Sequence, residues 1–266
     1  GKLSCWGRIS DDRDKLGNFH PIDLAPPEPV VALSASDSTL CINGLATRRC
    51  SRDGESWASA LAPRTLRDAS RFFGLQTRSL GPDGRCGVDK QGRLVCPDDL
   101  SKTVAKSDAA FAEATSTWMP SGAEVVCGRT EARTVRCFFA LNPPYKGING
   151  KPVGDPSVAA LTDVTQLAAA GGPGGPNLAC ALTASGAVYC WGDGQFGQLG
   201  APSIAHRESA APVGGLPPVA EIAVGGAFAC ARMAQGQVYC WGSNRYGEVP
   251  DGAPGQRDQP VVVRWP

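Results

Sequence analysis

The sequence has almost no net charge and no long apolar run. Its 26 lysine and arginine residues are balanced by 25 aspartate and glutamate residues. Proteins that wrap nucleic acid or lie on an anionic membrane carry an excess of basic residues, so neither partner is expected. No apolar stretch approaches the ~18 residues of a membrane-spanning helix. Residues 1–6 lack the pattern of a signal peptide, so an exported protein with this start would be a mature or trimmed form.

Histidine is scarce, which restricts metal binding and catalysis. The chain has two histidines, His20 and His206, and no two cysteines in C-x2-C spacing. Zinc sites need such ligands, so no zinc site is expected. Ser203 and Ser209 lie near His206, but three residues of one flexible loop do not hold the geometry of a catalytic triad. We therefore expect no catalytic, cofactor-binding or metal-binding residues. A carbohydrate-processing enzyme stays an alternative, because its carboxylates would come from distant repeats.

Cysteine, by contrast, is abundant and regularly spaced. Apart from Cys5, the 11 cysteines form couples that are nine or ten residues apart: Cys41/Cys50, Cys86/Cys96, Cys127/Cys137, Cys180/Cys190 and Cys230/Cys240. Counted from Cys5, the second members follow one another at intervals of 45, 46, 41, 53 and 50 residues. Repeats of this size are typical of the four-stranded blades of a β-propeller. The 33 glycines and 22 prolines agree with a turn-rich β protein.

The last two couples indicate antiparallel hairpins. Residues 180–192 read CALTASGAVYCWG, and residues 230–242 read CARMAQGQVYCWG. Folded as a hairpin, the first segment places Cys180 opposite Cys190 and leaves a three-residue loop, 184–186. A loop of this length needs a left-handed residue at its third position, which Gly186 supplies easily. Gly92 takes the same place in its hairpin, and Arg133 takes it with a poorer fit.

Each couple is therefore expected to form a disulfide within its own hairpin. Opposed residues of an antiparallel pair have Cα atoms ~4.5–5.5 Å apart, which is within disulfide reach. Each bond should contribute roughly 2–3 kcal/mol. Such a set of disulfides indicates an oxidising compartment, so we expect a secreted, periplasmic or cell-surface protein. Cys5 is equivalent to the second member of a couple. Its partner is expected about ten residues upstream, so Cys5 should be unpaired or bonded to another chain.

Two segments resemble the repeat of the regulator of chromosome condensation family. They are residues 164–200 and 219–247, each with a Y-C-W-G motif that contains its second cysteine. The resemblance is specific over roughly 160–266 and faint over 30–140. It implies a β-propeller, and the cysteines suggest the secreted bacterial branch. The guanine-nucleotide-exchange role of the nuclear member is not implied, because none of its site residues can be placed here. Another branch of the same propeller architecture looks like a secreted inhibitor that clamps enzymes with one face of the ring. This likeness favours protein binding as the function.

We predict an all-β chain that forms one propeller domain over residues 1–266. A half blade is expected at 1–29, followed by full blades at 30–68, 69–115, 116–162, 163–217 and 218–266. The count gives six four-stranded blades, one of them incomplete, and the resemblance leaves seven as the alternative. Residues 98–115 are expected to form a short helix, with Val104, Ala110, Phe111 and Ala114 on its apolar side.

Two further motifs have a structural interpretation. Residues 192–197 match the dinucleotide fingerprint G-x-G-x-x-G, but no helical pattern follows them, so these glycines are expected to serve a turn. Trp6, Trp191 and Trp241 follow the second cysteine of their repeats. We expect these tryptophans to pack within or between blades.

The expected function is the binding of another protein. Two connecting segments, 142–156 and 202–212, interrupt the repeat and are expected to be loops on one rim, where binding residues concentrate. The candidate partner-binding residues are Tyr145, Lys146, Lys151, Asp155, His206 and Arg207. An alternative function is that of a structural subunit in a cell-surface or extracellular assembly, in which a neighbouring chain completes the ring.

Overall fold

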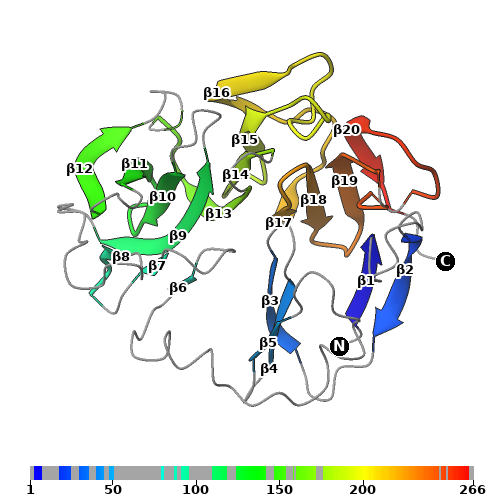
Figure 1. Ribbon diagram of the computed structural model, residues 1–266, viewed down its shortest axis with the longest axis horizontal. Helices are drawn as coiled ribbons and strands as arrows, with labels where there is room; N and C mark the ends of the chain where they lie inside the picture. The colour runs from blue at the N-terminus through cyan, green and yellow to red at the C-terminus, as the bar shows by residue number, and fades with distance from the viewer. Residues whose placement is uncertain are drawn as a thin grey trace.

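The computed structural model describes residues 3–7, 18–24, 30–35, 40–44, 48–50, 79–80, 87–88, 91–95, 110–118, 124–141, 147–153, 158, 160–171, 176–245, 247–249 and 251–263. The regular elements in these ranges are β-strands, apart from one helical residue, Val158 (Figure 1). Within them, no helix has the length and apolar character needed to cross a membrane.

The C-terminal part of the chain contains three consecutive four-stranded antiparallel sheets, in which each strand pairs with its neighbours in the chain. The first sheet contains β9 (Phe111–Trp118), β10 (Glu124–Thr130), β11 (Val135–Leu141) and β12 (Gly147–Val153). The second contains β13 (Val164–Ala170), β14 (Leu178–Thr183), β15 (Val188–Asp193) and β16 (His206–Pro212). The third contains β17 (Val219–Val224), β18 (Phe228–Met233), β19 (Val238–Gly242) and β20 (Arg257–Val262).

The N-terminal part contributes shorter sheets. Three strands, β3 (Val30–Ala35), β4 (Leu40–Gly44) and β5 (Arg48–Cys50), form one sheet. Another contains β6 (Ser79–Leu80), β7 (Gly87–Val88) and β8 (Leu94–Val95). The first two strands, β1 (Leu3–Gly7) and β2 (Asn18–Leu24), pair with each other in an antiparallel sheet.

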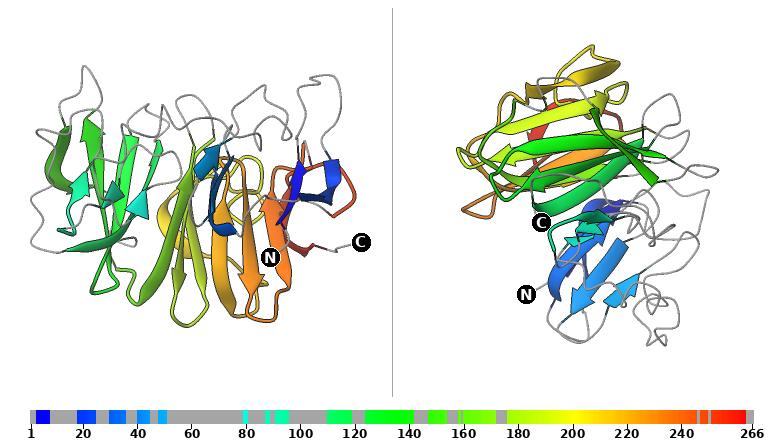
Figure 2. Two further views of the ribbon diagram at one scale, coloured as in Figure 1. Left: turned by 90° about the horizontal axis from the view of Figure 1, so that it is seen from below. Right: turned by 90° about the vertical axis from the view of Figure 1, so that its left-hand side faces the viewer.

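The four-stranded sheets are the blades of a β-propeller. Their first strands are the innermost strands of the blades, since β13 contacts both β9 and β17. Figures 1 and 2 show the three blades side by side in chain order, with β12 and β16 at the outer edges of theirs. The predicted fold class, an all-β propeller of four-stranded blades, is confirmed.

The hairpin register agrees with the prediction. Cys180 lies opposite Cys190, Ala181 lies opposite Tyr189, and the amide of Gly186 donates to the carbonyl of Thr183 at 2.9 Å. The third loop residue has a positive φ in four hairpins: 74° at Gly92, 61° at Arg133, 80° at Gly186 and 88° at Gly236. Three-residue loops therefore recur through the repeat, and in one of them an arginine adopts the left-handed conformation.

Three of the expected disulfides are described. Cys127–Cys137, Cys180–Cys190 and Cys230–Cys240 have Cα–Cα distances of 4.0, 4.1 and 4.1 Å, and each joins opposed residues of one hairpin. The strand register also places Cys41 opposite Cys50. Cys86 and Cys96 lie outside the described residues, although their neighbours Gly87 and Val95 pair in β7 and β8.

The prediction of a helix at 98–115 is wrong for the residues of this segment that the structure describes. Residues 111–118 form β9, which pairs with β10 and adjoins β13. The alanines and Glu113 of this segment favour a helix, but strand pairing and burial between two blades decide its conformation. The expected boundary between residues 115 and 116 therefore falls inside a strand. Residues 98–109 lie outside the described part.

Candidate functional site

The two segments predicted to be rim loops contain strands. Residues 147–153 of the first segment form β12, and residues 206–212 of the second form β16. Each is the fourth strand of its blade, because it pairs with the third strand and completes the sheet. The prediction of two loops is therefore wrong over these residues. Proline and glycine suggested loops, but an outermost strand tolerates both, since one of its edges needs no hydrogen-bonded neighbour.

The candidate residues lie on these outer strands or outside the described part. Lys151 is in β12, while His206 and Arg207 open β16. Tyr145, Lys146 and Asp155 lie outside the described residues. The structure therefore places His206 and Arg207 together at the outer edge of one blade, and it places Lys151 on the equivalent strand of the preceding blade.

His206 is held by an acidic residue of the adjacent strand. Its Nδ1 lies 3.0 Å from Oδ1 of Asp193, at the end of β15. The other carboxylate oxygen of Asp193 accepts the main-chain amide of Asn177 at 2.9 Å. The side chain of Asp193 is 15% exposed, and that of His206 is 36% exposed. Asp193 therefore ties the imidazole to a fixed main-chain group while leaving it accessible from the solvent.

Phe196 is a surface aromatic that the sequence-based search for contact residues overlooked. Its side chain is 38% exposed, and among the described residues it is the large hydrophobic side chain that is exposed rather than buried or half-buried. It lies in the connection from β15 to β16, within the G-x-G-x-x-G motif. Gly194 and Gly197 on either side of it mark a turn, and connecting segments usually lie at the surface, which is the sequence feature that points to Phe196.

Glycines hold this connection against the rest of the protein. A Cβ on Gly194 would collide with the carbonyl oxygen of Ile204, so the two ends of the connection can approach only without that side chain. Gly197 has a φ of 79°, and a Cβ there would lie 2.6 Å from the carboxylate of Asp258 on β20. The motif therefore serves a turn, as the sequence predicts, and the structure adds that this turn packs on the next blade.

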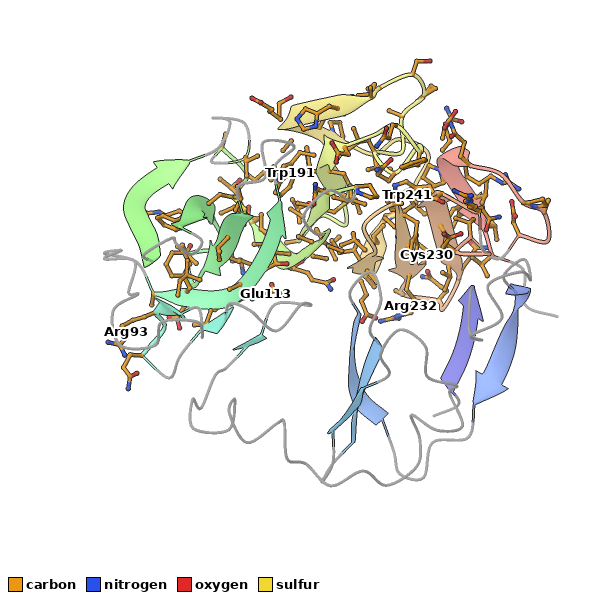
Figure 3. The ribbon with its side chains drawn as sticks, viewed as in Figure 1. Arg93, Glu113, Trp191, Cys230, Arg232 and Trp241 are labelled. Carbon is orange, nitrogen blue, oxygen red and sulfur yellow. A yellow bond between two sulfur atoms is a disulfide. The ribbon has the colours of Figure 1, made fainter. Side chains whose placement is uncertain are left out.

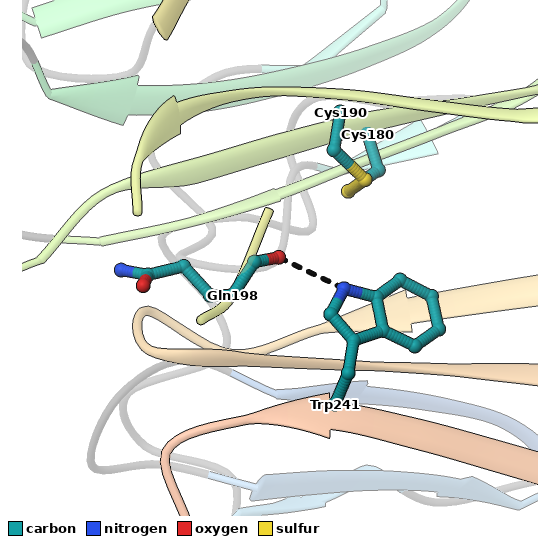
Figure 4. The surroundings of a disulfide bond; sticks show 4 residues. All are labelled: Cys180, Cys190, Gln198 and Trp241. Atoms are coloured by element: carbon teal, nitrogen blue, oxygen red, sulfur yellow. Dashed lines mark hydrogen bonds between the residues drawn. A yellow bond between two sulfur atoms is a disulfide. The ribbon is translucent and has the colours of Figure 1, made fainter. Parts of the chain in front are cut away.

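A buried hydrogen bond also fixes the connection between β15 and β16. The indole Nε1 of Trp241 donates to the carbonyl of Gln198 at 2.9 Å, and both residues are fully buried (Figure 4). Trp241 belongs to the third sheet and Gln198 to the connection of the second, so the bond joins two blades. Phe196 is thus displayed on a segment that is anchored two residues away in the core.

The blades are also joined by a main-chain bond that recurs. In each case the third residue of a hairpin loop accepts the amide of the first residue of the next innermost strand. The bonds are Gly92 O with Phe111 N (2.8 Å), Arg133 O with Val164 N (2.9 Å) and Gly186 O with Val219 N (3.0 Å). Each loop therefore positions the strand that begins the following blade.

A side chain on the innermost strand adds a second link. Oε2 of Glu113 accepts the amide of Leu167 at 3.0 Å and the Nε of Arg129 at 3.1 Å. Gln166, at the equivalent position of the next blade, binds both the amide and the carbonyl of Ile222 at 2.8 Å. Burial raises the pKa of Glu113, although the hydrogen bonds from Leu167 and Arg129 and the charge of Arg129 act in the opposite direction. Glu113 is labelled in Figure 3.

Models of the regulator of chromosome condensation (RCC1) repeat match this chain. One matches residues 164–198 and 219–248, and a second matches residues 185–232. Together these matches span residues 164–248, which are similar to this repeat. The matched residues lie in the blades β13–β16 and β17–β20, where the Y-C-W-G motifs were found. The resemblance seen in the sequence is thereby confirmed. A search of the curated proteins found none that matches.

The chain is similar to solved structures at low sequence identity. Human WBSCR16 is 13% identical with a TM-score of 0.50, and the match covers 98% of this chain and 78% of that one. Yeast RCC1 (Prp20), solved with bound Kap60, is 12% identical with a TM-score of 0.47, covering 99% and 57%. Prp20p from Saccharomyces cerevisiae, described with its binding to Gsp1p and histones, is 13% identical with a TM-score of 0.47. This chain spans 57% and 59% of the lengths of those two yeast chains.

Proposed function

We propose that this RCC1-repeat propeller binds another protein in an extracytoplasmic compartment. The observation that carries the proposal is Phe196, an exposed aromatic on a connection that glycine contacts and the Trp241–Gln198 bond hold in place. Aromatic side chains on rigid supports dominate the energetics of protein interfaces, because burying them removes much apolar area at little entropic cost. His206 and Arg207, which follow the same connection, would supply the surrounding polar contacts.

The disulfides support the proposed compartment. Cross-links recur in three successive blades at equivalent positions. Disulfides of this structural kind form and persist in oxidising environments and are rare in the reducing cytoplasm. We therefore propose a secreted, periplasmic or cell-surface location.

Binding is proposed rather than catalysis because the titratable pairs have structural partners. Glu113 joins Arg129 to the amide of Leu167 in the next blade. Asp193 joins His206 to the amide of Asn177. Each carboxylate thus already serves main-chain groups of the fold.

Point variants test the binding surface. Replacing the whole segment 142–156 would remove β12, so single side chains are the better probes. The partner would first be captured by cross-linking to the folded chain and identified by mass spectrometry, and its affinity would then be measured by calorimetry. We expect Phe196→Ala to weaken binding by about tenfold or more, equivalent to ~1.4 kcal/mol, and Arg207→Ala to weaken it less.

Gln235→Ala, an exposed loop residue of the last blade, is the matched control and should bind like the parent chain. Equal affinity of the Phe196 variant and the control would exclude this surface. Titration of accessible thiols in protein recovered from its native compartment tests the location, because fully reduced cysteines there would contradict it.

A further inference from the structure

The connection that displays Phe196 contacts the next blade at the start of β20. A Cβ on Gly197, the residue after Phe196, would lie 2.6 Å from Oδ1 of Asp258 and 2.8 Å from the carbonyl oxygen of Arg257. Figure 1 shows the connection between β15 and β16 beside β20. Because consecutive Cα atoms are ~3.8 Å apart, the carboxylate of Asp258 lies within about 8 Å of the Cα of Phe196. An exposed aromatic residue and a carboxylate of two different blades are therefore neighbours.

Asp258 carries a charge that no described residue neutralises. Its side chain accepts one hydrogen bond from the described residues, from Nε2 of Gln256 to Oδ1 at 2.8 Å. The ion pairs within the described ranges involve other carboxylates, those of Glu113, Asp193, Glu221 and Asp251. Asp258 is half-buried, so part of its hydration is already lost in the folded chain. A cation brought to Oδ2 of Asp258 would therefore meet an available acceptor.

The neighbouring arginine, Arg257, is bound within its own blade. Its Nε and Nη2 both donate to the carboxylate of Asp251, Nη2 at 3.1 Å. Its Nη1 donates to the carbonyl oxygens of Gly255 and Gln256 at 2.8 and 3.1 Å. Successive side chains of a strand point to opposite faces of the sheet, which directs Arg257 away from Asp258. The positive charge of Arg257 is thus paired with Asp251, and the charge of Asp258 is left for a ligand.

The main chain that carries the aromatic residue is fixed. The amide of Phe196 donates to Oε1 of Gln198 at 2.9 Å, and Gln198 is fully buried. Two successive turns hold the same segment, because the amide of Gly197 donates to the carbonyl of Gly194 and the amide of Gly200 donates to the carbonyl of Gly197, both at 2.9 Å. Binding a ligand here would therefore cost little main-chain freedom, which favours affinity.

An aromatic ring beside a carboxylate favours an arginine side chain as the ligand. The planar guanidinium can stack on an aromatic face while its N–H groups donate two parallel hydrogen bonds to a carboxylate. A lysine offers a compact, strongly hydrated point charge and does not stack in this way. An apolar side chain would bury the carboxylate of Asp258 without pairing it, which costs free energy.

We infer that Phe196 and Asp258 together bind one arginine side chain of the partner protein, with the guanidinium against the ring and its N–H groups on the carboxylate. Asp193, which precedes the connection, does not supply this acceptor, because its two oxygens already bind His206 and the amide of Asn177. The inference rests on the proposed function, since it names the group of the partner that the Phe196 surface recognises. It extends that surface from one blade to two.

Short peptides test the arginine site on the whole chain. The probe is an acetylated and amidated glycine–serine peptide with one central arginine, and its match carries citrulline, which keeps the shape of the side chain but not the charge. In NMR titrations we expect saturable binding of the arginine peptide with a dissociation constant on the order of 1 mM, and the largest shifts at the amides of Phe196, Gly197 and Asp258. The citrulline peptide should bind more weakly by about threefold or more, the scale of one exposed ionic contact.

Variants of the chain separate the two groups. Asp258→Asn removes the charge and Phe196→Leu removes the ring, so each should weaken binding of the arginine peptide by about threefold or more. Asp163→Asn is the matched control, because it makes the same chemical change at an exposed aspartate whose carbonyl bonds to Ala184 in the hairpin loop at the opposite end of β15. Asparagine tolerates the positive φ of 54° at this position, so the control should fold and bind like the parent chain. The inference is overturned if the arginine peptide does not bind, if the citrulline peptide binds equally well, or if Asp258→Asn binds like the control.

The captured partner distinguishes this inference from the proposed function. In calorimetry, Asp258→Asn should weaken the complex by about tenfold, and in double-mutant cycles it should couple to one arginine of the partner. A complex that is weakened by Phe196→Ala but not by Asp258→Asn would overturn the inference and leave the proposed function standing. If the arginine peptide binds as expected but the partner is insensitive to Phe196→Ala, the proposed function fails and the arginine site stands.

Discussion

Glu113 shows how one side chain can link two blades. Its carboxylate receives the amide of Leu167 from the next blade and the guanidinium of Arg129 from its own. Burial raises its pKa, so removal from water outweighs these favourable contacts when the group is charged. The equivalent residue one blade later is Gln166, which makes its interblade hydrogen bonds without a charge.

Replacing Glu113 should therefore have opposite effects depending on the new side chain. Glu113→Ala leaves the buried amide of Leu167 without its acceptor and should lower the free energy of unfolding by about 1–3 kcal/mol. Glu113→Gln keeps an acceptor and removes the buried charge, so at pH 7 it should unfold at the same or a higher temperature. Calorimetric thermal midpoints of the three proteins test both statements.

The pH dependence gives an independent check. A raised pKa means that the folded chain binds this proton more tightly than the unfolded chain, whose carboxyl titrates near its ordinary value of 4.5. The native carboxyl thus becomes less destabilising as the pH falls through its folded-state pKa. Any advantage of Glu113→Gln should shrink as the pH falls from 7 and vanish below 4.5. An advantage that stays constant over this range would show that charge burial is not the cause.

At the scale of the element, the repeated hairpin depends on one left-handed residue. Gly92, Gly186 and Gly236 adopt positive φ without a Cβ, whereas Arg133 does so at 61° with one. A left-handed conformation costs an L-residue roughly 1–2 kcal/mol. The hairpin of Cys127–Cys137 carries this strain because its turn must still offer the carbonyl of residue 133 to Val164.

Arg133→Gly should raise the thermal midpoint. The relief of strain exceeds the extra entropy that glycine adds to the unfolded chain, so we expect a gain of about 0.5–1 kcal/mol, or roughly 1–4 °C. The matched change in the reverse direction is Gly236→Ala, whose new Cβ meets no atom within 4 Å. It should lower the midpoint by a similar amount through the backbone alone. If both variants melt like the parent, the turn geometry does not limit stability.

At the scale of the whole molecule, stability depends on the surfaces between blades. Cys180–Cys190 packs in a hydrophobic cluster whose residues come from two blades. The described residues that pack around Cys230–Cys240 all come from its own blade. Trp241 reaches from the last blade into the core of the preceding one, and its indole bonds to Gln198. Blades are thus stabilised mainly by their neighbours, as in other repeat architectures.

Trp241→Phe should weaken the coupling of these two blades. It removes the donor to a buried carbonyl and part of a large buried ring, so we expect a loss of about 1–3 kcal/mol in denaturant unfolding. Amide exchange should rise first in β17–β20, because that blade loses its attachment. Trp191→Phe is the comparison, since Trp191 packs at the preceding interface without a bond to Gln198. Greater exchange in β13–β16 than in β17–β20 for the Trp241 variant would contradict this account.

Local features of the chain were predictable because they depend on short-range geometry. The spacing of Cys180 and Cys190 about a three-residue loop leaves one antiparallel register that places the two cysteines opposite each other. The glycine motif at 192–197 was recognised as a turn because nothing after it could continue as a helix. The segments 111–118 and 206–212 were assigned wrongly, because pairing with an adjacent strand outweighs the local preferences of alanine, glutamate and proline.

The amino-acid sequence by itself determined the repeat, the hairpin register and the disulfide pairs that the structure describes, since each follows from residues within about ten positions of one another. Tertiary structure alone decided the rest. That Glu113 contacts Leu167, or that Trp241 bonds to Gln198, depends on residues that lie 54 and 43 positions apart. The reason is physical: a hairpin closes through its own backbone, whereas an interface between blades exists only when two separately folded surfaces come into contact.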